Sequence, residues 1–160
     1  MLFASELVVP AQRQYDYTVH SLSSGKYSPP LPTSEDVTSP LGMPGSLPGR
    51  HLIVELHDAV NLDDASFIDQ ILRHAAEAAK AKVLALHHHV FTPDGGVTAF
   101  AMLAESHISI HTWPVECYAA VDIFMCGTCN PLACLLAFAT AFRPKRMSVL
   151  NLSRGSHALD

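Results

Sequence analysis

The sequence predicts an α+β two-layer sandwich, in which an antiparallel sheet carries two helices packed on one face. Residues alternate between the two sides over 107–112 and 118–125, and a period of two is typical of strands with one buried face. The stretch 97–104 is also expected to be a strand. Two other stretches carry helix signals instead, over 64–80 and 131–142. Short strands that follow one another, with two helices set apart from them, favour helices covering one face of a sheet.

The remaining strands are expected around this group. We expect one strand over 51–56, another over 83–90 and the last over 147–152. Each of these stretches is short, and it either is rich in β-branched residues or alternates between apolar and polar ones. The stretch 92–96 is a turn by composition, with proline, aspartate and two glycines. Asp122 is unusual in an apolar strand, and we expect it either to be hydrogen-bonded or to face a partner chain.

Both helices have recognisable starts. Asp63 and Asp64 precede the first, where acidic residues cap the free N–H groups and suit the helix dipole. Asn130 is a good cap for the second, and Pro131 suits its first position because proline lacks an N–H that would be unpaired there.

The first part of the chain has a different character from the rest. Residues 1–48 show no lasting helical or strand period and contain many Ser and Thr residues, which predicts a disordered or loosely attached extension. Either Met43 is the true start, or the extension is a genuine flexible segment. We expect one folded domain over 49–155, followed by a short tail over 156–160. The prolines of the extension are Pro10, Pro29, Pro30, Pro32, Pro40, Pro44 and Pro48.

Length and charge exclude several classes of protein. The 160 residues are enough for one domain with a real core. A net charge of −5 gives no sign of a nucleic-acid-binding surface. No apolar run approaches the roughly 20 residues needed to cross a bilayer, and residues 1–4 lack the basic start of a secretion signal. We therefore expect a cytoplasmic protein that binds neither nucleic acid nor membrane, with its four cysteines reduced.

Two linked stretches carry the residue types of nucleophilic and acid–base chemistry. Residues 105–114 have the sequence Glu-Ser-His-Ile-Ser-Ile-His-Thr-Trp-Pro, and 118–127 the sequence Tyr-Ala-Ala-Val-Asp-Ile-Phe-Met-Cys-Gly. Together they closely resemble the bacterial and archaeal S-adenosylmethionine decarboxylase proenzymes. The resemblance extends from about Gly49 to Gly155. It implies an antiparallel sheet with helices on one face and an enzyme assembled from two protomers.

The resemblance also implies a covalent pyruvoyl cofactor that the chain makes itself. The chain would cut itself between Glu105 and Ser106, giving a β chain of residues 1–105 and an α chain whose first residue, derived from Ser106, is the pyruvoyl group. This group would form a Schiff base with S-adenosylmethionine and accept electrons as CO2 leaves, the task that pyridoxal phosphate performs elsewhere. The product, decarboxylated S-adenosylmethionine, serves spermidine synthesis.

Three further residues receive roles from the resemblance. His111 is the expected proton acceptor in processing, and Thr98 stands where the family has a serine hydroxyl that assists it. Cys126 is the expected proton donor to the decarboxylated substrate, because a thiol with a pKa of about 8.5 is protonated at neutral pH yet can give up its proton. In a regular strand Ser106 and His111 would face opposite sides. We therefore expect Ser106 to precede the strand, or a bulge to realign it.

The substrate-binding residues are predicted less directly. Phe91 resembles a family aromatic that stacks on adenine, although its spacing to Thr98 is one residue longer here. Trp113 is expected to pack near the site. After the Trp-Pro pair the family commonly has a glutamate near the substrate, and this chain has Val115 there, with Glu116 one place later. Glu116 would replace the family carboxylate if the loop is shifted.

Two other functions stay open at this point. Val115 leaves room for a pyruvoyl-dependent decarboxylase of a basic amino acid, such as ornithine or arginine. A non-catalytic regulatory paralogue is the second alternative. The presence of Ser106, His111 and Cys126 together argues against it, because such a subunit has no need to retain them.

No metal site is expected. Cys126 and Cys129 form a Cys-x-x-Cys, which alone would suit half a zinc site or a redox pair. No second pair exists, because only Cys117 and Cys134 remain. The histidines at 87–89 lie in a predicted strand, where neighbouring side chains alternate faces and three in a row cannot converge on one ion.

Overall fold

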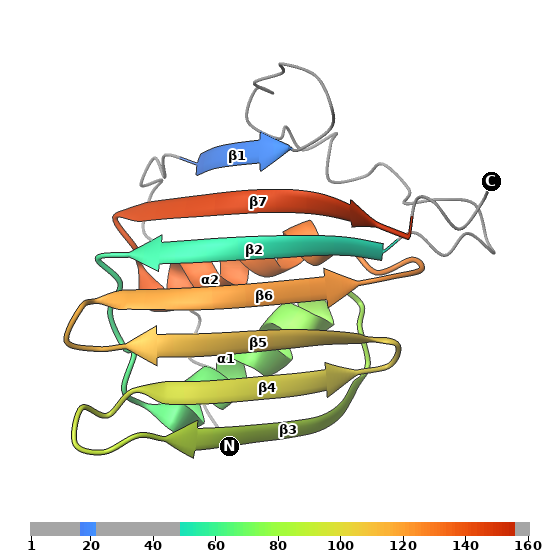
Figure 1. The fold of residues 1–160 in the computed structure, drawn as a ribbon. Helices are drawn as coiled ribbons and strands as arrows, with labels where there is room; N and C mark the ends of the chain where they lie inside the picture. The colour runs from blue at the N-terminus through green and yellow to red at the C-terminus, as the bar shows by residue number, and fades with distance from the viewer. Residues whose placement is uncertain (1–16, 22–48, 156–160) are drawn as a thin grey trace, which may run out of the picture.

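The computed structural model describes residues 17–21 and 49–155, and of 17–21 it describes the backbone. Seven strands form one sheet in the order β1-β7-β2-β6-β5-β4-β3. The helices α1 and α2 lie behind this sheet in Figure 1, and within the described residues no helix covers the opposite face. This opposite surface is called the open face below. The arrangement confirms the predicted α+β two-layer sandwich.

Six of the strands pair in an antiparallel manner, which confirms the predicted sheet. Each predicted strand is present, and the ends differ from the predicted ones by a few residues at most. Every second residue of a strand points to the helices, and its neighbours point to the open face. The six strands are β2 (Gly49–His57), β3 (Val83–Val90), β4 (Val97–Leu103), β5 (Ser106–Trp113), β6 (Tyr118–Met125) and β7 (Arg146–Arg154).

The two helices begin where capping residues satisfy their first N–H groups. α1 (Ala65–Ala78) starts after Asp64, whose carboxylate accepts the Phe67 N–H at 2.9 Å. α2 (Cys134–Phe142) is shorter than predicted, because Pro131–Ala133 forms a 3₁₀ turn, η2, before it. Asn130 caps this turn by accepting the N–H of Leu132 at 3.1 Å. The predicted cap is therefore correct, and the helix that follows it starts three residues late.

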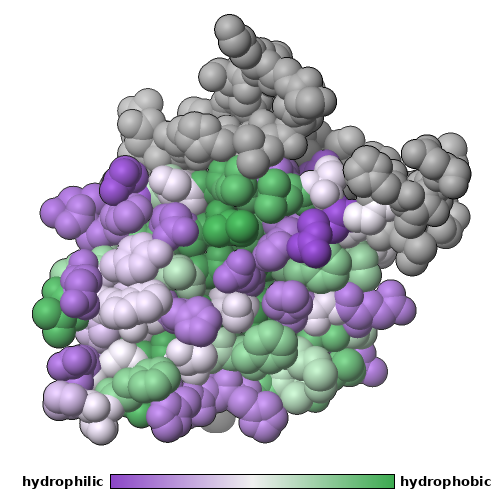
Figure 2. Space-filling view, in the orientation of Figure 1, coloured by the Kyte–Doolittle hydropathy of each residue, from purple (hydrophilic) through white to green (hydrophobic). Residues whose placement is uncertain are grey.

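The core lies between the sheet and the helices. Leu52, Val54 and Leu56 of β2 are fully buried there, as are Phe138 and Phe142 of α2. The open face is different, because it mixes polar side chains with large apolar ones that remain partly exposed (Figure 2). Trp113 is 43% exposed on it and Met102 is 46% exposed. An exposed face of this composition is typical of a surface that another protein chain covers.

The first strand corrects the expectation of no regular structure before residue 49. β1 (Tyr17–Ser21) pairs in parallel with β7 and forms the edge of the sheet. The sequence pattern did not predict it, because a five-residue edge strand has too few residues to establish a period. The rest of the extension and the tail over 156–160 lie outside the described residues. Among the described residues, no helix has both the length and the apolar character that a membrane crossing requires.

Candidate active site

Ser106 lies at a tight hairpin turn between β4 and β5. It is the first residue of β5 and pairs with Leu103, so that Ala104 and Glu105 form the turn. Glu105 has a φ of 62°, which is the left-handed region that residues other than glycine rarely adopt. Such a conformation costs about 1–3 kcal/mol. The peptide bond that was predicted to be cut therefore follows a strained residue.

Cys126 contacts both sides of this peptide bond. It follows the end of β6, and its thiol donates to the Glu105 carbonyl oxygen at 3.1 Å. Its backbone N–H donates to the Ser106 Oγ at 3.3 Å, and its Sγ lies 3.8 Å from the same Oγ. Cys126 thus places its thiol on the Glu105 carbonyl oxygen and its N–H on the Ser106 hydroxyl.

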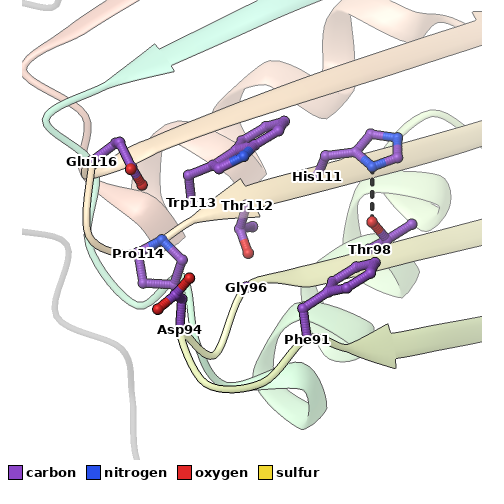
Figure 3. Close-up of a pocket in the computed structure, with 9 residues that line it drawn as sticks. All are labelled: Phe91, Asp94, Gly96, Thr98, His111, Thr112, Trp113, Pro114 and Glu116. Carbon is purple, nitrogen blue, oxygen red and sulfur yellow. Dashed lines mark hydrogen bonds between the residues drawn. The ribbon is translucent and has the colours of Figure 1, made fainter.

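His111 and Thr98 form a second group, on the open face. They are cross-strand partners on β5 and β4, and the Thr98 Oγ1 lies 2.8 Å from the His111 Nδ1. Beside them is a cavity of about 370 Å³. Figure 3 shows Phe91, Thr98 and His111 on one side of it, Asp94, Pro114 and Glu116 at the other end, and Trp113 between. The residues that line the cavity are Phe91, Asp94, Gly96, Thr98, His111, Thr112, Trp113, Pro114 and Glu116.

The β3–β4 turn accommodates its extra residue without moving Phe91 away from the cavity. The Phe91 N–H donates to the Gly96 oxygen at 2.7 Å, and the Gly95 N–H donates to the Phe91 oxygen at 2.9 Å. Gly95 has a φ of 70°, which glycine adopts without strain. The sequence predicted this turn but not that Asp94 and Gly96 would line the cavity. The only signal was that both lie in the turn that follows Phe91.

The β5–β6 turn places Glu116, and not Val115, at the cavity. The Cys117 N–H donates to the Pro114 oxygen at 3.2 Å, and Cys117 has a φ of 51°. In this turn Val115 is 72% exposed to solvent, whereas Glu116 lines the cavity. A carboxylate is therefore present at the cavity despite the valine.

The two groups lie at opposite ends of the sheet. Five residues of β5 separate Ser106 from His111, and a rise of about 3.3 Å per residue places them about 17 Å apart. In Figure 1 the β4–β5 turn and the end of β6 lie on the right, and the two turns beside the cavity lie on the left. β5 pairs with β4 and β6 in unbroken register, so no bulge brings Ser106 to His111. The predicted realignment does not occur, and Ser106 begins the strand instead of preceding it.

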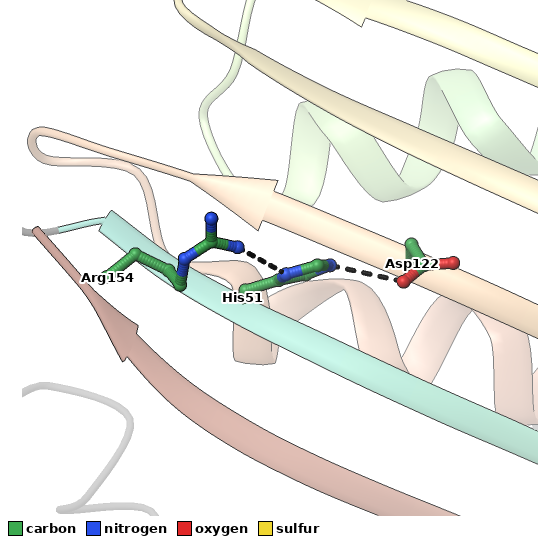
Figure 4. Close-up of polar contacts among 3 residues, drawn as sticks. All are labelled: His51, Asp122 and Arg154. Atoms are coloured by element: carbon green, nitrogen blue, oxygen red, sulfur yellow. Dashed lines mark hydrogen bonds and ion pairs between the residues drawn. The ribbon is translucent and has the colours of Figure 1, made fainter.

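A polar cluster on the open face was not predicted. The Arg154 guanidinium lies 3.1 Å from the His51 Nδ1, and the His51 Nε2 lies 3.1 Å from Asp122 (Figure 4). Because a guanidinium can only donate, Nδ1 must accept and Nε2 must carry the proton toward the carboxylate. Asp122 is thus hydrogen-bonded and also lies on the open face. Burial, and then the neighbouring His51, lower the pKa of the adjacent His107. The sequence predicted a hydrogen bond for Asp122 as one of two alternatives but not its partners, because these depend on which strands are neighbours.

Within the described part of the chain, no three His, Cys, Asp or Glu side chains are arranged to hold a metal ion. The His88 Nδ1 lies 2.9 Å from Asp69, whereas the His89 ring packs against Phe91, with 4.7 Å between the ring centres. Cys129 donates to the Lys80 carbonyl oxygen at 3.6 Å, away from any second thiol pair. Each of these side chains thus has its own structural partner.

A sequence model of the family named S-adenosylmethionine decarboxylase matches residues 50–155. The chain belongs to this family. The S-adenosylmethionine decarboxylase proenzyme of Thermomicrobium roseum is 44% identical over 108 residues, which are 67% of this chain and 93% of that protein. The proenzyme of Prochlorococcus marinus is 47% identical over 110 residues, or 66% of this chain and 88% of that protein.

A solved structure supports the same assignment. The adenosylmethionine decarboxylase of Aquifex aeolicus aligns with a TM-score of 0.65 and 28% identity, over 72% of this chain and 98% of that one. The matches confirm the resemblance inferred from 105–127 and identify the chain as a member of a family of carboxy-lyases. The family match begins at residue 50, so β1 lies outside it.

Proposed function

We propose that the chain is a self-processing S-adenosylmethionine decarboxylase that uses a pyruvoyl group derived from Ser106. The observation that carries the proposal is the position of Cys126, which places its thiol on the Glu105 carbonyl oxygen and its backbone N–H on the Ser106 hydroxyl. A structural cysteine has no need for both contacts. The same residue is well placed for two successive tasks, one in processing and one in decarboxylation.

In processing, the Ser106 hydroxyl attacks the Glu105 carbonyl carbon, and the amide becomes an ester. The Cys126 thiol, 3.1 Å from the carbonyl oxygen, stabilises the negative charge that develops there. Loss of the Ser106 Cα proton then breaks the Cβ–O bond and releases residues 1–105 with a new C-terminal carboxylate. The dehydroalanine that remains takes up water and loses ammonia, which leaves the pyruvoyl group.

The pyruvoyl group supplies an electron sink, through a Schiff base to the substrate amine, for the release of CO2. The residues at its site fit it, because Cys126 lies beside Ser106, the residue from which the group derives, with its Sγ 3.8 Å from the Ser106 Oγ. After CO2 has left, Cys126 donates a proton to the substrate Cα. A neutral thiol suits this task at physiological pH.

The cavity favours a nucleoside substrate over a small basic amino acid. Its volume of about 370 Å³ lies within the range of ligand pockets, and Phe91 and Trp113 offer aromatic surfaces for a flat base. Glu116 provides acceptors for ribose hydroxyls. Ornithine has no flat group to lay against the aromatic surfaces, and arginine offers only its small guanidinium plane, so a nucleoside would use more of the cavity. The product would enter spermidine synthesis in the cytoplasm.

The distance between the two groups supports a site that is built from two copies of the chain. His111 is the proposed base of processing, yet it lies about 17 Å from Ser106 along β5. If two chains pack their open faces together about a twofold axis, the Ser106 end of one meets the His111 end of the other. We therefore propose a homodimer of αβ units with two sites, each built from both chains.

Intact mass of the purified protein, followed by assay of CO2 from carboxyl-labelled S-adenosylmethionine, tests this proposal. We expect two fragments that meet at Glu105–Ser106, with a ketone in place of the amine on the second, and release of CO2. Ser106→Ala is expected to remain uncut. CO2 from ornithine or arginine alone would establish the other decarboxylase. An uncut wild-type chain that never changes with time would leave the regulatory paralogue.

A further inference from the structure

Tyr118 packs directly behind the aromatic wall of the cavity. It is the first residue of β6 and the register partner of Trp113 on β5. The two rings stack with 5.2 Å between their centres and 30° between their planes. Trp113 lines the cavity, whereas Tyr118 does not. Within this cavity, Tyr118 can therefore act on a bound ligand through Trp113.

The far end of the Tyr118 side chain is fixed to a third strand. Its hydroxyl donates to the Glu55 carboxylate on β2. The His57 ring lies on another side of it, with 5.4 Å between the ring centres. Burial, and then the Glu55 hydrogen bond, raise the pKa of Tyr118 to about 12. The hydroxyl thus remains a donor at every pH at which an enzyme of this kind would be assayed.

We propose that Tyr118, anchored by Glu55, is a positioning residue that holds Trp113 in place as a wall of the substrate cavity. Trp113 ends its strand on the open face and is 43% exposed within one chain, and its other ring neighbour, His111, lies farther away, with 6.4 Å between the ring centres. A side chain that is ordered before the ligand arrives need not be ordered on binding, which strengthens binding. The identity of the ligand rests on the function proposed above.

The chain provides its own probe for this role, because Trp113 is the sole tryptophan of the sequence. Its fluorescence therefore reports on the cavity wall alone. The test compares Tyr118→Leu, which removes the ring, with Tyr118→Phe, which removes only the hydroxyl. The measurements are acrylamide quenching of Trp113, and KM and kcat for S-adenosylmethionine.

Tyr118→Leu is expected to increase acrylamide quenching and to raise KM about two- to tenfold, the range expected for ordering one side chain. Its kcat should stay within about twofold of the wild type, because Tyr118 touches no reacting group. Tyr118→Phe should give quenching and KM values between those of Tyr118→Leu and those of the wild type. Glu55→Gln keeps an oxygen acceptor for the hydroxyl and should behave almost as the wild type, whereas Glu55→Ala should resemble Tyr118→Phe.

Phe100→Leu is the matched control. It also removes an aromatic ring from the open face, but this ring stacks on His107 and does not line the cavity. It should leave Trp113 quenching and KM unchanged. Equal changes in the control and in Tyr118→Leu would show a general effect on the open face and overturn the proposal.

The proposal would also be overturned if Tyr118→Leu folded normally with unchanged quenching and KM. A fall in kcat with KM unchanged would contradict a positioning role as well. Failure of the proposed function is separable, because the wild type would then neither cut itself nor release CO2. The quenching of Trp113 needs no turnover and would still decide whether Tyr118 holds the ring.

Discussion

At the scale of the residue, the backbone of Glu105 is the feature with the clearest consequence for chemistry. Its φ of 62° precedes the peptide bond proposed to be cut, and this conformation stores about 1–3 kcal/mol. If attack by Ser106 releases the strain, it contributes to the rate of processing. The rate of self-cleavage would then depend on the β4–β5 turn as well as on the residues of the motif, because the turn imposes the strained conformation of Glu105.

Glu105→Gly tests this idea, because glycine adopts the same φ without strain. We expect slower self-cleavage, by a factor of about 5 to 150 if all the strain is used. In a Ser106→Ala background the same change should raise the melting temperature of the precursor. Band intensities of cut and uncut chain over time give the rate. Glu105→Gln keeps the strain and serves as control, with a rate near that of the wild type. Equal rates for the glycine variant and the wild type would remove strain from the mechanism.

The roles of single residues were predicted unevenly, and the reason is physical. The resemblance identified Phe91, Thr98, His111, Trp113 and Glu116 as site residues, and the cavity brings all five together. Their roles remain predictions. Contacts such as Tyr118 with Glu55 were missed, because β2 and β6 are neighbours in the sheet but distant in the chain, and the residue pattern of one strand does not encode strand order.

At the scale of the element, strands and helices were predictable where a period extends over several residues. β5 and β6 alternate throughout and were placed within one residue at each end. The start of α2 was wrong because a 3₁₀ turn and an α-helix share the same capping signals. β1 was missed because its pairing depends on β7 and not on its own pattern.

The β3–β4 turn yields a prediction at this scale. A Cβ on Gly96 would lie 2.8 Å from the Thr112 carbonyl oxygen of β5, so that Gly96→Ala must push the turn away from its neighbour. We expect a loss of about 1–3 kcal/mol in the free energy of unfolding. KM for S-adenosylmethionine should also rise, because Phe91 and Asp94 move with the turn.

Gly95→Ala is the matched comparison in the same turn. Its Cβ would come no closer than 3.6 Å to Asp63, and the cost is the strain of a φ of 70° alone. Gly95→Ala should lower the free energy of unfolding, but for the same loss of stability it should raise KM less than Gly96→Ala does. Urea unfolding and steady-state kinetics of both variants give the two quantities. Equal KM for both variants at similar stability would contradict the view that Gly96 sets the cavity wall.

At the scale of the whole molecule, the proposed dimer would build each site from two halves that lie far apart in one chain. The Ser106 and Cys126 half lies at one end of the sheet, and the His111 and Thr98 half at the other. The open face between them mixes apolar and polar side chains, including the hydrogen-bonded pair of His51 and Asp122. Packing of two open faces would cover this surface and complete both sites at once.

Complementation between two inactive variants tests this arrangement. A Ser106→Ala chain and a His111→Ala chain carry different tags, are co-expressed, and are purified through both tags in turn. In the mixed dimer one site lacks both residues, whereas the other has Ser106 from the His111→Ala chain and His111 from its partner. We therefore expect the His111→Ala chain to be cut and the Ser106→Ala chain to stay whole. Each variant alone is the control and should remain uncut or nearly so. If neither chain of the purified mixed dimer is cut, each site must lie within one chain, and the open face has another role.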